Sequence, residues 1–275
     1  METENNTLKP TIKCLNCGTE FQGNYCPECG QSAQTRRYIM KSIFDDLRST
    51  IAGTGGNIWF TFKSLFTQPG KMVVDFIDGK RIRYQSPISM LLLVTTLYIL
   101  ILSFTNGFDV IKSIIDSGSV ASENAVDTEK VSQGLTTLFL KGVDFLRNHY
   151  AFCFFVTLPL YVVAARVCYG KSNRKRYNWA EYTIPIIYSM VIVILYRCVI
   201  RLVPQELTFL LGVFVTPIVV VMAFSACFRK MIGFNKVITI FLSILTSVLY
   251  YIMMLGVIFI IAFIAASILS IKYHP

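Results

Sequence analysis

The sequence contains little charge, and its second half contains the least. Charged residues make up 15% of the chain and hydrophobic residues 54%, whereas about a quarter of a soluble domain is usually charged. Residues 237–271 contain no charged side chain. An uncharged apolar run of this length cannot form a surface in water. The composition therefore predicts an integral membrane protein and excludes an ordinary soluble domain.

Groups for acid–base and nucleophilic chemistry are also scarce. Histidine occurs only as His149 and His274, and Asp and Glu are absent from the middle of every long apolar segment. Their absence argues against a carboxylate proton relay across a membrane. The chain contains no GxSxG, Walker or HExxH motif. We therefore predict that the protein is not an enzyme.

Five apolar segments approach or exceed the roughly 20 residues that a membrane-spanning helix needs. The sequence thus predicts an all-α integral membrane bundle of about five transmembrane helices over residues 87–275. The last segment is long enough to be either one tilted helix or a hairpin broken near Gly256. The side of the membrane on which the C-terminus lies depends on whether this segment crosses once or twice. We favour one helix because no polar turn separates its halves. The segments are 87–104, 151–169, 183–203, 207–228 and 237–271.

The distribution of Lys and Arg predicts the orientation. Eleven basic residues precede the first span, the stretch 105–150 carries four basic and six acidic residues, and both 170–178 and 229–236 are basic. Basic loops collect on the cytosolic side, so we predict a cytosolic N-terminus. The polar opening METENNTLKP has no apolar signal-peptide core, which indicates a retained N-terminus. The net charge of +10 follows from these loops, and we expect no nucleic-acid partner.

Two CxxC pairs, Cys14/Cys17 and Cys26/Cys29, lie near the N-terminus, with a glycine after each. Four thiolates at this spacing favour a structural Zn²⁺ site in a zinc ribbon over residues 1–34. Four sulfur ligands leave no position for a catalytic water. Two disulfides or free thiols are the alternatives, and a reducing cytosol disfavours disulfides. We expect residues 21–25 between the pairs to form a tight hairpin.

Residues 35–86 predict interfacial amphipathic helices followed by a basic motif. Apolar residues recur at helical spacing over 38–51, an aromatic stretch covers 58–66, and a third helix over 71–78 ends at Gly79. Such helices lie in the headgroup plane of a membrane. The basic motif allows two interpretations: topology signalling with anchoring, or a site for lipid headgroup phosphates. Its members are Lys80, Arg81 and Arg83.

The stretch from Pro69-Gly70-Lys71 through Gly79-Lys80-Arg81 to Tyr84 and Pro87, together with the YCPxCGQ end of the ribbon, resembles the DUF3667 family of uncharacterised bacterial membrane proteins. The resemblance covers about the first hundred residues. It implies a protein of the bacterial cytoplasmic (inner) membrane, and it implies no activity.

Two functions remain open, and we favour the first because the residues with specific chemistry all lie in the predicted cytosolic part. The first is a non-enzymatic membrane adaptor whose ribbon and basic segment dock a cytosolic protein or anionic membrane lipids. The second is a small transporter or a lipid- or metabolite-handling protein. Arg197 and Arg201 lie one turn apart on one helix face. We expect an enclosed cavity beside these two arginines to favour the second function.

Overall fold

The computed structural model describes residues 11–35, 37–51, 57–105, 150–173 and 177–273. A small cysteine module, residues 11–34, contains the antiparallel strands β1 (Ile12–Lys13) and β2 (Glu20–Phe21). The remaining elements are helical. They are α1 (Met40–Ile51), α2 (Ile58–Thr67), α3 (Pro69–Ile77), α4 (Pro87–Phe104), α7 (Tyr150–Asn173), α8 (Trp179–Arg201), α9 (Gln205–Leu210), the π-helix η1 (Leu211–Val215), α10 (Thr216–Ile232) and α11 (Lys236–Tyr273).

The long helices pack around α8. Residues 180–191 of α8 are all buried, and α4, α7 and α10 pack along it, while α11 packs against α10 and α7. Stacked aromatic rings join neighbouring helices, as where Tyr169 of α7 lies 4.5 Å from Phe228 of α10 between ring centroids. The outer faces stay apolar: Leu93, Leu97 and other large side chains of α4 are exposed. An apolar exterior around an apolar core suits a bundle surrounded by hydrocarbon.

Within the described residues, four helical runs are long and apolar enough to cross a membrane: α4, α8, Leu211–Ile232 and Lys236–Ile261. The predicted spans 87–104, 183–203, 207–228 and 237–271 coincide with them apart from their ends. The predicted span 151–169 lies inside α7, which is not one of the four. The count of five spans therefore stays a prediction.

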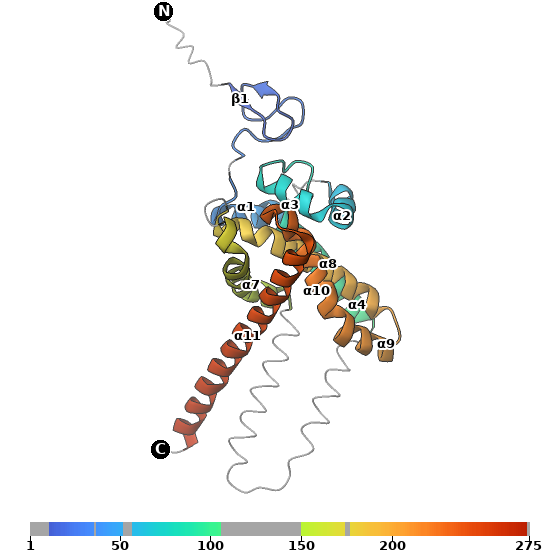
Figure 1. Ribbon diagram of the computed structural model, residues 1–275, viewed down its shortest axis with the longest axis vertical. Helices are drawn as coiled ribbons and strands as arrows, with labels where there is room; N and C mark the ends of the chain where they lie inside the picture. Colours follow the sequence, from blue (N-terminus) through green and yellow to red (C-terminus); the bar gives the residue numbers. More distant parts are fainter. Residues whose placement is uncertain (1–10, 36, 52–56, 106–149, 174–176, 274–275) are drawn as a thin grey trace, which may run out of the picture.

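Helix α11 runs without a break from Lys236 to Tyr273, so the chain does not turn back at Gly256. Its 38 residues extend about 57 Å at 1.5 Å per residue, nearly twice the hydrocarbon thickness of a bilayer. The described side chains from Leu255 to Ile264 are exposed, and α11 continues beyond its neighbours to the C-terminus (Figure 1). One crossing by this helix requires a strong tilt or a protruding end.

The short helices α1, α2 and α3 lie at one end of the bundle, between the long helices and the cysteine module (Figure 1). We call this end the capped end. Helix α3 packs on α8 and α10, and α1 packs on α4 and α8. A Cβ atom at Gly70 would lie 2.8 Å from the carbonyl oxygen of Ala226 in α10. Glycine at this position lets the start of α3 touch the backbone of α10.

Candidate metal centre and its contact with the basic turn

The two CxxC pairs form two turns with the same backbone hydrogen bonds. In the first, Gly18 N–H donates to the Cys14 carbonyl and Cys14 N–H donates to the Thr19 carbonyl, both at 2.9 Å. In the second, Gly30 N–H donates to Cys26 and Cys26 N–H donates to Gln31 at the same distance. Both glycines have positive φ, 83° and 75°, a conformation that other residues adopt only with strain. The glycine after each pair therefore lets the chain fold back around its two sulfurs.

The predicted hairpin over residues 21–25 is wrong. Phe21 pairs with Ile12 of β1, and Tyr25 forms a bridge with Ser32. Each CxxC turn is thus closed by residues on its own two sides, and the segment 21–25 connects one turn to the other. The backbone groups that would have closed a hairpin within this segment are used in these two pairings.

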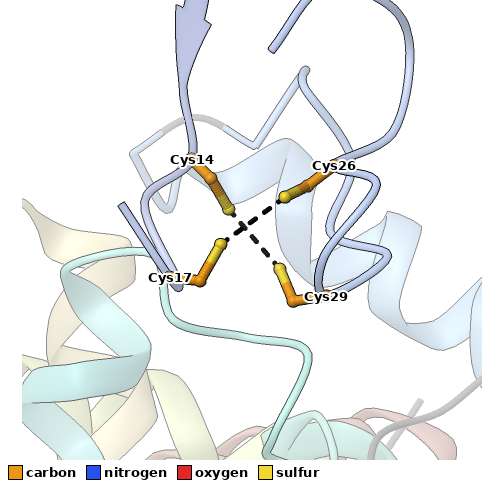
Figure 2. Close-up of side chains that lie close together, drawn as sticks. All are labelled: Cys14, Cys17, Cys26 and Cys29. Carbon is orange, nitrogen blue, oxygen red and sulfur yellow. Dashed lines mark hydrogen bonds between the residues drawn. The ribbon is translucent and has the colours of Figure 1, made fainter. Parts of the chain in front are cut away.

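The four sulfur atoms converge on one point (Figure 2). All four lie within 4.8 Å of one another, and the closest pairs, Cys14–Cys29 and Cys17–Cys26, are 3.5 Å apart. A disulfide needs about 2.05 Å, so neither pair is bonded. A tetrahedral shell with metal–sulfur bonds of about 2.3 Å has edges of about 3.8 Å. The observed distances bracket that value, and the residues fit a four-sulfur metal site.

The four thiols differ in their surroundings. Burial raises the pKa of Cys26 to about 11, whereas hydrogen bonds from the hydroxyl and backbone N–H of Thr19 lower the pKa of Cys17 to about 6. The sulfur of Cys17 lies 3.3 Å from that hydroxyl. A thiolate is the form that binds metal. Metal binding by these cysteines therefore releases protons.

The cysteine module contacts the basic turn, which we define as residues 79–84 between α3 and α4. The side chain of Gln31 is buried; its Nε2 donates to the Gly79 carbonyl at 2.8 Å, and its Oε1 accepts from Arg81 N–H at 3.2 Å. Gly79 has φ 100°, and a Cβ there would lie 2.7 Å from Cδ1 of Leu15. One residue from each CxxC turn thus contacts the basic turn.

The three basic residues predicted to form a phosphate site point to different surroundings. Lys80 Nζ pairs with Asp75 at 3.0 Å and its side chain is 44% exposed. Arg81 lies over two aromatic rings, with its guanidinium carbon 5.2 Å from the ring centre of Tyr38 and 5.5 Å from that of Phe76. Arg83 is exposed. The structure therefore does not bring the three together, and their binding of lipid phosphate stays a prediction.

Arg81 belongs instead to a partly buried polar cluster beneath the turn. The hydroxyl of Tyr38, a fully buried residue, donates to Asp46 Oδ2 of α1 at 2.7 Å. Burial raises the pKa of Asp46, and Arg81 opposes that shift. Burial also lowers the pKa of Arg81, against the attraction of Asp46. A buried charge is tolerated when it is paired, so Arg81 and Asp46 stabilise each other.

An ion pair ties the segment that follows the module to α8. Arg37 makes two hydrogen bonds to the carboxylate of Glu181, at 2.6 and 2.8 Å, and the Glu181 side chain is 1% exposed. The same carboxylate accepts from the backbone N–H of Asn178, completing a capping box at the start of α8. The Asn178 side chain donates to the Tyr38 carbonyl at 2.8 Å. The residues after the module are thereby fixed at the capped end.

Residues 56–99 match the family model described as "Protein of unknown function (DUF3667)". This confirms the resemblance over that stretch, which includes α2, α3, the basic turn and the first two thirds of α4. Comparisons with curated proteins and with solved structures gave no match. The cysteine module lies outside the DUF3667 stretch in sequence but contacts it in space through Gln31. The match brings no activity, so function has to be argued from the geometry.

Sequence reasoning missed the residues that join these parts. The sequence analysis identifies Gln31 only within the YCPxCGQ pattern and does not single out Glu181. Its Asn-x-x-Glu spacing from Asn178 is a capping-box pattern that was visible in the sequence. The pairing of Glu181 with Arg37 crosses 144 positions and leaves no local signal.

Proposed function

We propose that the protein is a non-enzymatic adaptor of the bacterial cytoplasmic membrane. Its cysteine module holds a structural zinc ion on the cytosolic side, and together with the capped end it docks a cytosolic protein or anionic lipid headgroups. The observation that carries the proposal is the contact of Gln31 and Leu15 with the basic turn. Since the module is fixed to the bundle, anything that it binds is held at a defined place over the membrane.

The charge distribution supports a cytosolic capped end. Lys230, near the end of α10, lies against the start of α3, so the basic connection between α10 and α11 is on the same side as the basic turn. Arg229, Lys230 and Lys236 are exposed there. Lys and Arg of short loops concentrate on the cytosolic side, and a reducing compartment keeps four thiols available for metal.

Exposed aromatic residues support contact of the capped end with the membrane interface. Trp59 and Phe66 of α2 are 81% and 63% exposed, and Phe44 of α1 is 68% exposed. Rings this exposed are unusual in water but typical of the headgroup level, where Trp is enriched. Helix α2 packs on α3, which precedes the first span, so a position at this level agrees with the path of the chain.

The lipid part of the proposal depends on Lys80 and Arg83, since Arg81 is engaged below the turn. Each basic residue near a negatively charged membrane surface contributes about 1 kcal/mol to binding. Replacing both residues with Gln should therefore weaken the preference for anionic lipid by about fivefold per residue. Quenching of tryptophan fluorescence by brominated phosphatidylglycerol, relative to brominated phosphatidylcholine, measures this preference. Both tryptophans of the chain, Trp59 and Trp179, are exposed.

Arg81→Gln is the contrasting variant in this assay. It should lower the melting temperature because it leaves the half-buried Asp46 without its cation, while the lipid preference of the folded fraction stays as in the wild type. An unchanged preference in the Lys80/Arg83 double variant would remove lipid from the proposal. A loss confined to Arg81→Gln would instead place the phosphate contact at the buried guanidinium.

The protein part is tested by site-specific photo-crosslinking in native membranes. Tyr25 is 69% exposed on the cysteine module, so a benzophenone side chain there should yield a discrete protein adduct, and Cys26→Ser should abolish it. Leu202, 71% exposed just after α8, is the matched control position at the opposite end. The adaptor role would be refuted by the same adducts from both positions, or by adducts that survive loss of the metal site.

A second candidate function is favoured by one specific observation. A half-open cavity of about 300 Å³ lies beside Arg197, where an enclosed cavity beside both arginines was expected of a lipid- or metabolite-handling protein. Arg201 does not line it. Binding in this cavity and docking at the capped end concern different parts of the chain, so one does not exclude the other.

A further inference from the structure

The cavity beside Arg197 is built from four helices. It lies between α7, α8, α10 and α11, where α11 diverges from α8 and α10 (Figure 1). Its volume of about 300 Å³ is at the lower end of the range for small-molecule sites. None of its lining residues belongs to the polar cluster of Arg81 at the capped end.

Arg197 gives the cavity a positive charge. Met190, Ile194 and Arg197 recur on one face of α8 and all line the cavity. None of the described lining residues is acidic. A guanidinium carries five N–H donors in a fixed fork, which lets it bind an anion while keeping another hydrogen bond.

Arg197 lies one helical turn further from the end of α8 than Arg201. The Nε atom of Arg201 is 3.3 Å from the hydroxyl of Thr105, the residue that caps the end of α4. Arg201 is thus at the level where two spans end, and Arg197 lies about 6 Å further along the span at 1.5 Å per residue. An arginine within a span costs free energy, and the side chain of Arg197, which lines the cavity, is exposed.

Apart from Thr157 and Thr216, the rest of the wall is aromatic or apolar. Tyr161 of α7 stacks on Tyr250 of α11, with ring centroids 3.5 Å apart, and on Phe224 of α10 at 5.3 Å. These three residues are 9% exposed or less, so each presents only a small part of its apolar surface to the cavity, and the tyrosine hydroxyls add polar groups. A wall with a cation and a larger apolar surface matches a ligand with a small charged head and an apolar body.

The backbone of the adjoining wall is also irregular. The π-helix η1 ends directly before Thr216, a lining residue whose hydroxyl donates to the Leu211 carbonyl at 3.4 Å. The same carbonyl accepts from the hydroxyl of Tyr196 at 3.1 Å. Single π turns within helices occur frequently at functional sites. Here the π turn sets the position of Thr216 at the cavity.

We propose that this cavity binds a membrane-partitioning amphiphile with one anionic head group, a carboxylate or a phosphate. Arg197 binds the head group, and the rings of Tyr161, Phe224 and Tyr250 contact the apolar part. The site does not depend on the adaptor role, and it requires no transport. It takes its ligand either as a long-chain lipid from the bilayer or as a smaller aromatic acid from water.

Binding of radiolabelled palmitate to the full chain in phosphatidylcholine nanodiscs tests the site. Arg197→Gln should weaken Kd at least about tenfold, which corresponds to 1.4 kcal/mol. The matched control Arg201→Gln removes the same charge one turn away and should change Kd by no more than about twofold. Val193→Phe keeps the arginine but fills part of the cavity, and should weaken Kd as strongly. If Arg197→Gln does not fold, this variant decides.

Three results would overturn the proposal. They are no palmitate binding above empty nanodiscs, equal binding by Val193→Phe and wild type, and equal loss in the Arg197 and Arg201 variants. Competition by uncharged hexadecanol as strong as by palmitate would also refute the role of the charge. Labelled 3-phenylpropanoate identifies the source of the ligand: binding as tight as that of palmitate indicates a soluble aromatic acid, and weaker binding indicates a lipid.

Discussion

Replacing Gln31 with Ala should detach the cysteine module from the basic turn without emptying its metal site. The metal site is retained because the backbone carbonyl of residue 31, which accepts from Cys26 N–H, is unchanged by the substitution. The module is released because the side-chain amide makes both hydrogen bonds to the turn, to the Gly79 carbonyl and from Arg81 N–H. Zinc content should therefore stay at the wild-type level while the contact weakens.

The magnitude follows from the groups left behind. Each buried donor or acceptor that loses its partner costs about 1–3 kcal/mol. For the backbone N–H of Arg81, this free-energy cost corresponds to amide hydrogen exchange about 5- to 150-fold faster than in the wild type. Amide exchange of the full chain in detergent, followed by mass spectrometry of the peptide covering residues 79–84, measures it.

Gln34→Ala is the matched control. Gln34 is the same residue type three positions further on, and it is exposed, so its loss should leave exchange in the basic turn unchanged. The reasoning is refuted if Gln31→Ala and wild type exchange equally at Arg81. It is also refuted if Gln31→Ala loses zinc, since the amide would then be part of the metal site and not of the contact.

Three further predictions concern the metal, the packing of α3 and the orientation. Cys26→Ser should lower the zinc content from one per chain to near zero and leave membrane insertion intact. Replacing a cysteine of the bundle with serine should leave the zinc content unchanged. Zinc retained by Cys26→Ser would contradict the four-sulfur site. Gly70→Ala should destabilise the protein by about 1–3 kcal/mol through its clash with α10, measured as a lower melting temperature, and Gly256→Ala, which meets open space, should not. Phosphatase fusions should be active after Phe104 and inactive after Gly233; the reverse pattern would invert the topology.

Local signals in the sequence predicted the elements well, because their causes are local. Helix α3 was expected over 71–78 and spans Pro69–Ile77, with Gly79 at φ 100° after it. The first span was expected at 87–104, the bounds of α4, where Pro87 follows the cap Ser86. The CxxC spacing predicted a cluster that the structure places within 4.8 Å. Proline, glycine and cysteine act through the backbone nearby, so a single sequence carries their effect.

The arrangement of the basic motif was not predictable in the same way. Lys80, Arg81 and Arg83 look alike in the sequence, yet one pairs with Asp75, one lies over Tyr38 and one is exposed. Their separation depends on Asp46 of α1 and on the rings of Tyr38 and Phe76, which lie beneath the turn. No local pattern states which cation faces those rings. Long-range packing decided it, as it did for Arg37 and Glu181.

The contacts form a continuous path from the metal site to the central helix of the bundle. Gln31 binds the basic turn, Arg81 of that turn lies over Tyr38, and the Tyr38 carbonyl accepts from Asn178, which caps α8. Spatial continuity alone does not show that the two ends are coupled. It does identify the contacts at which coupling can be tested. If the metal stabilises the bundle through this path, Gln31→Ala should destabilise the start of α8 as metal removal does, because both changes disrupt the contact between the cysteine module and the basic turn.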